Sequence, residues 1–299
     1  MLITRSVIAL REHLADWKQQ AESIALVPTM GNLHDGHLSL VKAANAQAAH
    51  TVVSIFVNPL QFAPNEDFAS YPRTFAEDID KLRQYHVDAV FAPDVGEMYP
   101  DNEIASTYID VPGLSECLEG EFRPGFFRGV ATVVNKLFNM VQPDIAFFGE
   151  KDYQQLLVIR KMVKDLNIPV EIQSVATVRE TDGLAMSSRN QYLQPVQRMQ
   201  SGIIYQAMQT VRDQVMQGAN FTDIEQQMIQ QLTQQGFVVD YLTLREPVSL
   251  QKPDSTDSLN YLEKAGSKVC NSLIILVAVR LGTTRLIDNL RFSLKPVDR

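Results

Sequence analysis

Apolar segments and amphipathic segments alternate along the first half of the chain. Segments rich in apolar, β-branched or aromatic residues predict strands at 24–27, 51–57, 87–91, 144–148 and 170–178. Segments with apolar residues at helical spacing predict helices at 37–49, 74–85, 130–141 and 152–166. Strands that are apolar throughout and alternate with such helices indicate a parallel sheet covered on both faces. We therefore predict an α/β fold with a doubly wound parallel sheet.

The pattern changes near residues 180–190. Residues 191–235 are rich in Gln and have helical periodicity, and strand-like segments follow at 238–244, 273–279 and 285–287. The stretch 251–268 is largely polar, with Pro and Gly, and suggests a loop whose role the pattern does not reveal. We predict two domains, residues 1–185 and a smaller α+β domain over residues 186–299.

Composition narrows the class of protein. The chain of 299 residues is 45% hydrophobic and 21% charged, which is typical of a globular protein, and its formal net charge is −8. A chain this acidic, without a basic run, is not expected to bind nucleic acid. Cys117 and Cys270 form no CxxC pattern, so we expect a reducing compartment and no structural zinc. Neither a signal peptide nor an apolar run long enough to span a bilayer is evident, which predicts a cytoplasmic protein without a membrane partner.

The most informative polar segment lies between the first predicted strand and the helix after it. Gly31 and Gly36 match half of a phosphate loop, but His37 and Leu38 stand where that loop has Lys and Ser or Thr. What remains is His34-x-Gly36-His37 at a helix N-terminus, where unpaired N–H groups and the helix dipole attract anions. The alternatives are a helix cap with two solvated histidines, or a metal pair that lacks an obvious third ligand.

The His-x-Gly-His pattern after a first strand resembles the nucleotidyltransferase superfamily, which includes class I aminoacyl-tRNA synthetases. Five segments narrow the resemblance to the pantothenate synthetase family, in the order that family has them: residues 28–31 (PTMG), 56–62 (FVNPLQF), 71–74 (YPRT), 148–155 (FGEKDYQQ) and 182–189 (DGLAMSSR). The match is dense over residues 20–195 and looser afterwards.

The resemblance implies a fold, a reaction and partners. The fold would be a Rossmann-like catalytic domain that binds ATP and pantoate, followed by a small lid domain. The chain would ligate pantoate and β-alanine to pantothenate through a pantoyl adenylate, releasing pyrophosphate and AMP, with Mg²⁺ accompanying ATP. A homodimer is also implied.

The resemblance further assigns residues to ATP. His34, His37 and Lys151 would be catalytic, with the two imidazoles on the phosphates and the lysine near the α-phosphate. The implied ATP-binding set is Met30, His34, His37, Gly149, Lys151, Asp152, Val178, Met186, Ser187, Ser188 and Arg189. The last three would close over the β- and γ-phosphates. The simpler alternatives are a solvated loop lysine for Lys151, a helix-start acid for Asp152, and a serine N-cap in the 187–188 pair.

The implied pantoate residues are Gln61 and Gln155, with Asn58 shaping the pocket. Neutral amides can orient a carboxylate and leave it nucleophilic. Glu77 and Asp78 match acidic positions that the family links to magnesium, and the alternative is an exposed helix face.

One position departs from the family. The usual Arg-Pro-x-His-Phe is Arg-Pro-Gly-Phe126-Phe here, so a polar role at that position would be lost, or taken over by Arg128 or water. The competing functions are another nucleotidyltransferase, which would need a cationic acceptor site where Gln61 and Gln155 stand, and a nucleotide-sensing protein without catalysis.

Overall fold

The computed structural model describes residues 1–299 except 65, 103–105, 258–260, 262–271 and 295–299. Cys270 and most of the polar stretch 251–268 therefore lie outside the described residues. The described chain divides into two compact units, Met1–Val178 and Arg179–Arg299. Within the described residues, no helix is long and apolar enough to cross a membrane.

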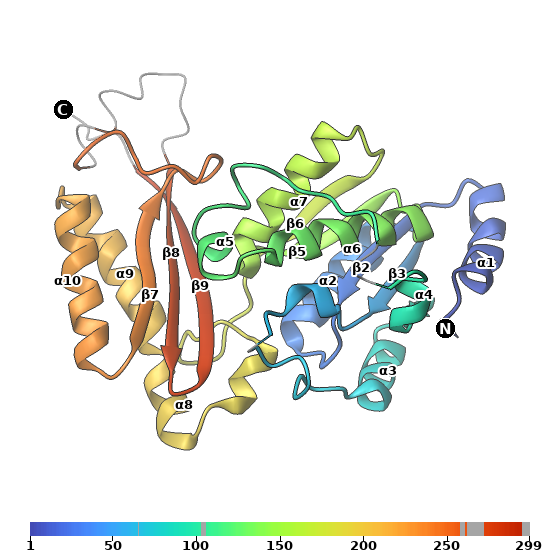
Figure 1. Ribbon diagram of the computed structural model, residues 1–299, viewed down its shortest axis with the longest axis horizontal. Coiled ribbons are helices and arrows are strands. Elements are labelled where there is room, and N and C mark those ends of the chain that lie inside the picture. The colour runs from blue at the N-terminus through green and yellow to red at the C-terminus, as the bar shows by residue number, and fades with distance from the viewer. Residues whose placement is uncertain (65, 103–105, 258–260, 262–271, 295–299) are drawn as a thin grey trace. The chain divides into compact units, whose positions relative to one another are not determined.

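The first unit contains a six-stranded parallel sheet flanked by helices (Figure 1). The strand order is β1-β4-β3-β2-β5-β6. The strands are β1 (Leu2–Thr4), β2 (Ile24–Thr29), β3 (His50–Ile55), β4 (Ala89–Phe91), β5 (Ile145–Gly149) and β6 (Glu171–Val175). The helices are α1 (Val7–Gln19), α2 (Asp35–Gln47), α3 (Phe75–Gln84), α4 (Val95–Met98), α5 (Glu119–Phe122), α6 (Phe126–Val141) and α7 (Tyr153–Asp165). Two short 3₁₀ turns, η1 (Pro59–Gln61) and η2 (Glu150–Asp152), follow β3 and β5.

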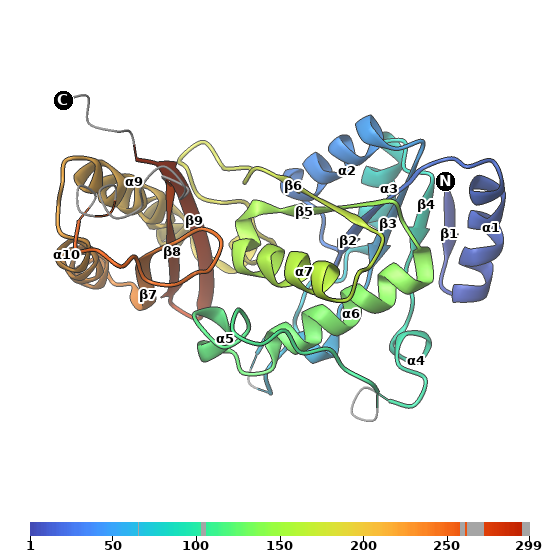
Figure 2. The same cartoon turned by 90° about the horizontal axis from the view of Figure 1, so that it is seen from above.

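Both faces of this sheet are covered because strands such as β2 and β4 are apolar on both sides. Successive residues of a strand point to opposite faces, so Leu26 packs into one core with α1, α6 and α7, while Ala25 and Val27 pack into another with α2 and α3. Figure 2 shows α2 and α3 on one side of the sheet and α6 and α7 on the other. The doubly wound architecture predicted from the apolar strands is confirmed.

The strand order places one crossover at the centre of the sheet. From β2 the chain moves outward through β3 to β4, and it later returns to the other side of β2 as β5, which pairs in parallel with β2. Ligands of such sheets bind where the strand order reverses, beyond the carboxyl ends of the strands. In this chain that point lies between the end of β2 at Thr29 and the end of β5 at Gly149.

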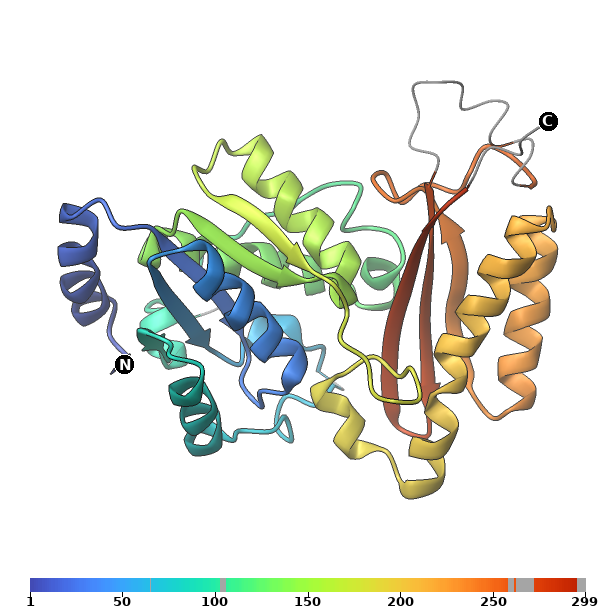
Figure 3. The ribbon, with the colours of Figure 1, turned by 180° about the vertical axis from the view of Figure 1, so that it is seen from behind.

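The second unit contains a three-stranded antiparallel sheet with helices packed against it (Figures 1 and 3). Its elements are η3 (Ser188–Tyr192), α8 (Pro195–Ser201), α9 (Ile203–Met216), α10 (Phe221–Gln234), β7 (Val238–Arg245), β8 (Ser272–Leu281) and β9 (Thr284–Ser293). Apolar side chains of α9 and α10, such as Met208 and Met228, form one core with the central strand β8. The smaller α+β unit expected from the sequence is therefore present.

Three features of the fold were not anticipated. The strand β1 and helix α1 at the start of the chain, and the short helices α4 and α5, have no counterpart in the predicted elements. Strand β9 runs for ten residues, where only 285–287 was expected. The segment 179–185 was assigned to the first domain, yet its Arg179 and Asp182 make their ion pairs with Asp288 and Arg198 of the second unit.

Candidate active site

The loop that leads from β2 to α2 is held in place by polar contacts on both sides. Gly31 has φ +80, and a Cβ there would lie 3.1 Å from Asp78 Oδ2 and 3.2 Å from Ile55 Cγ2, so glycine fits both the conformation and the space. The backbone N–H of Gly31 donates to Thr29 Oγ1 at 3.2 Å, and that hydroxyl donates to Ser54 O on β3 at 2.8 Å. These two hydrogen bonds therefore anchor the start of the loop to the ends of β2 and β3.

Helix α3 fixes the other side of this loop. The buried Asp78 carboxylate accepts from the backbone N–H groups of Asn32 at 2.9 Å and Leu33 at 2.7 Å. Thr74 Oγ1 also donates to it at 3.2 Å, and Lys81 Nζ donates to Leu33 O at 2.6 Å. The conformation of the loop that delivers His34 thus depends on side chains more than forty residues away in sequence.

The two histidines of the His-x-Gly-His pattern open helix α2. His34 is the N-cap residue, and its Nδ1 accepts from the backbone N–H of Gly36 at 3.1 Å. His37 Nδ1 accepts in turn from the backbone N–H of His34, at a longer 3.4 Å, and the two ring centroids lie 4.1 Å apart. The helix-cap alternative therefore describes His34 correctly. It does not exclude a ligand role, because each ring uses only one of its two nitrogens in the cap.

Burial and neighbouring charges set the protonation state of both rings, and the cap contacts select the tautomer. Desolvation, then the charge of Lys151, lowers the pKa of His34 from 6.5 to about 4. Desolvation, then His34, Lys151 and Lys81, holds the pKa of His37 well below 6.5. Both imidazoles are therefore neutral at pH 7. Since each Nδ1 accepts a backbone N–H, the ring proton resides on Nε2, which makes each Nε2–H a hydrogen-bond donor.

Residues at the end of β5 complete the electrostatics of this region. Lys151 lies in η2 directly after Gly149, and its charge acts on both histidines, so the structure brings together the three residues that were predicted to be catalytic. Asp152 lies 3.5 Å from Lys151 Nζ and makes no side-chain cap contact at the start of α7. A Cβ at Gly149 would meet nothing within 4 Å, so the protein itself does not require glycine there.

The predicted pantoate residue Gln61 lies at the end of η1, with its side chain buried. Arg123 donates to the backbone oxygen of Gln61 at 2.9 Å and forms a two-point ion pair with Glu66, at 2.6 and 2.7 Å. The Arg123 guanidinium also lies 3.8 Å from the ring centroid of Phe126. Phe126 therefore packs against the arginine that holds the Gln61 turn, which gives this departure from the family pattern a structural role.

The remaining positions near η1 differ in what they contact. Asn58 is buried and bonded within the protein, because Nδ2 donates to Gly129 O and Oδ1 accepts from Tyr99 Oη at 2.9 Å. Asn58 thus shapes the turn, and direct contact with a substrate stays a prediction. Gln155 is half-buried in the first turn of α7. Arg128, the suggested replacement for a family histidine, is instead exposed, and its Nε and Nη2 each donate to a carboxylate oxygen of Asp110 at 2.8 Å.

The two predicted magnesium ligands lie in different environments. Glu77 is exposed, whereas Asp78 is buried with both oxygens accepting hydrogen bonds from the loop. Among the described residues, no group of three or more His, Cys, Asp or Glu side chains could hold a metal ion. The exposed-face alternative therefore describes Glu77 but not Asp78, and magnesium binding by either residue stays a prediction.

Four predicted nucleotide residues belong to the second unit. Met186 precedes η3, and Ser187 caps it by accepting from the backbone N–H of Arg189 at 3.3 Å, while Ser188 begins the turn. The serine-cap alternative is therefore confirmed. Contact of these residues with phosphates stays a prediction, as do the roles of Met30 and of Val178, the last residue of the first unit.

Sequence reasoning missed three residues of the first unit. Lys81 adds a second positive charge near the histidines, Arg123 holds the Gln61 turn, and the buried Gln154 amide binds the 114–119 loop through Leu114 O, Cys117 O and the Glu119 N–H. Each acts on a segment at least 35 positions away, so no local pattern points to it.

The chain is similar to known proteins over its whole length. A sequence model of the family described as pantoate-beta-alanine ligase matches residues 2–291. Pantothenate synthetase of Methylococcus capsulatus is 49% identical over 98% of this chain and 99% of its own, and that of Nitrosococcus oceani is 46% identical over 100% of both. The crystal structure of pantothenate synthetase from Thermus thermophilus matches with TM-score 0.87 and 43% identity, covering 99% of this chain and 100% of that one. Pantoate-beta-alanine ligase from Francisella tularensis, complexed with beta-gamma ATP and beta-alanine, matches with TM-score 0.79 and 32% identity over 97% of each chain.

Proposed function

The chain belongs to the pantoate–β-alanine ligase family, and from that premise we propose that it makes pantothenate from pantoate, β-alanine and ATP. The pantoate carboxylate attacks the α-phosphorus of ATP, and pyrophosphate leaves with the electron pair of the broken P–O bond. The β-alanine amine then attacks the acyl carbon of the pantoyl adenylate, loses a proton, and displaces AMP.

The observation that carries this proposal is the pair of neutral imidazoles at the β2–β5 crossover. Each keeps Nε2–H as a donor, because its Nδ1 accepts a backbone N–H. Donors that are already oriented stabilise charge as it develops on phosphate oxygens, without reorganising at the moment of reaction. We assign His34 and His37 to the triphosphate of ATP on this ground.

Positive charge beside these donors supports the same assignment. Lys151 follows β5 and Lys81 reaches the loop from α3, and both add to the effect of desolvation and of His34 in lowering the pKa of His37. Phosphoryl transfer depends mainly on positioned cations and requires no protein nucleophile. We propose that Lys151 contacts the α-phosphate region, with Gly149 and Asp152 near the ribose and Ser187, Ser188 and Arg189 contributing to the β- and γ-phosphates.

We assign pantoate to Gln61 and Gln155. A neutral amide can donate to a carboxylate without neutralising it, so the acid remains a nucleophile. The turn that carries Gln61 is fixed by Arg123 and by the close approach of Gly129, where a Cβ would lie 2.2 Å from Leu60 O. A fixed amide favours one orientation of the substrate, which brings its carboxylate in line with the phosphorus.

Three further features belong to the proposal. Magnesium enters as the complex with ATP, since Mg²⁺ is commonly held by substrate phosphates with few protein ligands. The protein works in the cytoplasm, in keeping with two cysteines that form no CxxC pattern. We also propose that it forms a homodimer, which size-exclusion chromatography with light scattering measures directly.

Exchange of labelled pyrophosphate into ATP tests the first half-reaction. We expect exchange that depends on pantoate and does not need β-alanine. His34→Gln and His37→Gln should each reduce the exchange rate by about 10²–10³-fold, the usual effect of removing one oriented donor. His13→Gln serves as the matched control, because His13 lies on α1 and packs against Trp17.

The outcomes separate the competing functions. Exchange without pantoate would identify a different nucleotidyl transfer, and no exchange under any condition would identify a nucleotide-binding protein without catalysis. Equal rates for His37→Gln and His13→Gln would remove the imidazole pair from the mechanism.

A further inference from the structure

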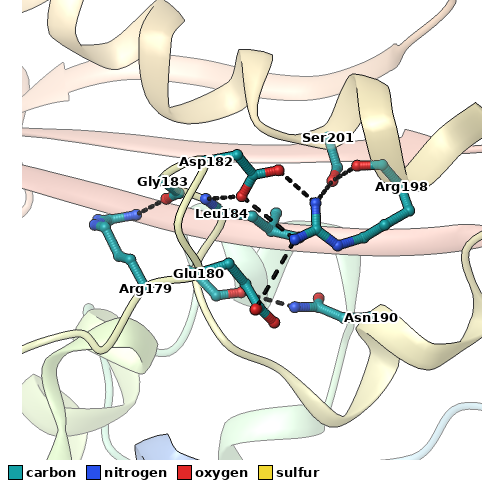
Figure 4. Close-up of polar contacts among 9 residues, drawn as sticks. Arg179, Glu180, Asp182, Gly183, Leu184, Asn190, Arg198 and Ser201 are labelled. Atoms are coloured by element: carbon teal, nitrogen blue, oxygen red, sulfur yellow. Dashed lines mark hydrogen bonds and ion pairs between the residues drawn. The ribbon is translucent and has the colours of Figure 1, made fainter.

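Two arginine–carboxylate pairs tie the segment 179–190 to the rest of the second unit, and Figure 4 shows the second of them, Asp182–Arg198, beside the Arg179–Gly183 contact. In the first, both terminal nitrogens of Arg179 donate to the nearly buried Asp288 on β9, at 2.5 and 3.0 Å. Arg179 also donates to Asn289 O at 3.1 Å and to Gly183 O at 3.0 Å. The guanidinium of Arg179, at the start of the segment, therefore connects the turn at Gly183 to the core strand β9.

The second pair lies on the other side of the turn. Arg198 of α8 donates to both carboxylate oxygens of Asp182 and forms an ion pair with Glu180 at 3.9 Å. Asp182 Oδ1 also accepts from the backbone N–H of Leu184 at 3.2 Å, which fixes the turn itself. The pairing lowers the pKa of Asp182, mainly through the hydrogen bond from Arg198.

Packing reinforces both pairs. Gly183 has φ +92, and a Cβ there would lie 2.5 Å from Tyr205 Cδ1, so the turn rests directly on that ring. The same ring stacks against the Arg179 guanidinium, whose carbon lies 3.9 Å from the ring centroid. Leu184 and Ala185 are buried, with Leu184 in the core of the second unit. The turn is thus held by two ion pairs and by contact with an aromatic ring.

We infer that Arg179–Asp288 and Asp182–Arg198 form a clamp that carries the Ser187–Arg189 segment as a fixed part of the second unit. Two further contacts order the segment itself: Asn190 Nδ2 donates to Ala185 O at 3.1 Å, and Ser187 caps η3. The segment therefore moves only when the whole second unit moves, and not as a free loop. The clamp residues are positioning residues, and this role rests on the proposed binding of ATP phosphates by Ser187–Arg189.

Holding the segment in one conformation lowers the entropy lost when it binds a ligand. Without the clamp, ATP would have to order the segment on binding. Steady-state kinetics should therefore show a rise of about tenfold in KM for ATP in Asp182→Asn and Asp288→Asn, equivalent to about 1.4 kcal/mol. We expect kcat and KM for pantoate to stay within about twofold of the wild type, since the four clamp residues belong to the second unit, whereas the two histidines and the pantoate turn belong to the first.

Trypsin cleavage after Arg189 gives a second measurement that does not depend on catalysis. A segment released from the clamp opens more often, so we expect cleavage about tenfold faster in both variants. Asp182→Glu restores the carboxylate and should recover part of both effects. Asp213→Asn is the matched control, because Asp213 forms an exposed pair with Arg212 at 2.7 Å on α9, away from the turn.

The inference would be overturned if Asp182→Asn and Asp288→Asn had the same KM for ATP and the same cleavage rate as the control Asp213→Asn. If Asp288→Asn does not fold, the half-exposed Asp182 pair carries the test alone. Faster cleavage with an unchanged KM for ATP would mean that the clamp stabilises the folded segment but does not assist nucleotide binding, which would overturn the proposed role. A wild-type protein without pantoate-dependent turnover would overturn the proposed function, whereas the cleavage rates would still decide whether the segment is clamped.

Discussion

Asp78 has two possible roles, holding the active-site loop or binding magnesium, and substitution of this residue separates them. Its two oxygens accept from the backbone N–H groups of Asn32 and Leu33. Asp78→Asn keeps the size of the side chain but replaces one acceptor oxygen with an NH₂ group. One backbone N–H then faces another donor in a buried place. A lost hydrogen bond to a charged group costs about 1.5–3 kcal/mol, so the free energy of unfolding should fall by about 2–3 kcal/mol.

The same substitution should weaken nucleotide binding, because the displaced loop leads directly into His34. We would measure urea unfolding, KM for ATP and the Mg²⁺ dependence of turnover, with Glu77→Gln as the control. Glu77 is exposed on the same helix and should leave stability unchanged. The loop-holding role would be refuted if Asp78→Asn were as stable as the wild type and if both Asp78→Asn and Glu77→Gln required more Mg²⁺. That result would restore the metal-binding interpretation.

Four other substitutions or conditions test the remaining steps. Because the pKa of His34 is lowered from 6.5 to about 4, the folded protein binds fewer protons than the unfolded chain between these values, so the contribution of His34 to stability is full above pH 6.5 and is lost as the pH falls toward 4. Urea unfolding at pH 7.5 and pH 5 should therefore show a larger loss of stability in the wild type than in His34→Gln, which keeps only the smaller loss due to His37 and other groups, and equal losses in both proteins would contradict this. Phe126→His restores the family's polar group and should give faster turnover or tighter ATP binding, and unchanged kinetics would contradict this. Gly129→Ala, with its Cβ 2.2 Å from Leu60 O, should lower unfolding free energy by about 1–3 kcal/mol and raise KM for pantoate. Gly149→Ala meets no protein atom within 4 Å and should raise KM for ATP without loss of stability.

The sequence predicted the sheet well because its signals are local. Strand β3 needs only a run of β-branched and apolar residues, and α2 needs only helical spacing after a capping residue. The same holds for the His-x-Gly-His pattern, whose four residues lie together in the chain. The first strand β1 was missed because three residues carry too little pattern, although pairing with β4 suffices to form it in the fold.

The supporting residues of the site could not be predicted, because their roles arise from tertiary contacts. Asp78 and Lys81 belong to an amphipathic helix and have no local mark that distinguishes them from solvated charges. Only the packing of α3 beside the β2–α2 loop gives them partners. Arg123 is similar, since it reaches Glu66 and the Gln61 oxygen across 57 and 62 positions of sequence.

An acidic chain can bind a polyanion if its positive groups gather where the anion binds and its own rings do not compete for protons. The net charge is −8, yet Lys151 and Lys81 both act on the histidines at the positive end of α2. Burial, together with those same lysines, keeps the imidazoles neutral, so the rings themselves add no positive charge. Neutrality is instead what fixes the donors: a neutral ring with an occupied Nδ1 has one tautomer, whereas a charged ring would oppose the backbone N–H that it caps. The lysines thus provide the charge and the histidines the direction, which explains why the two residue types meet at one crossover of the sheet.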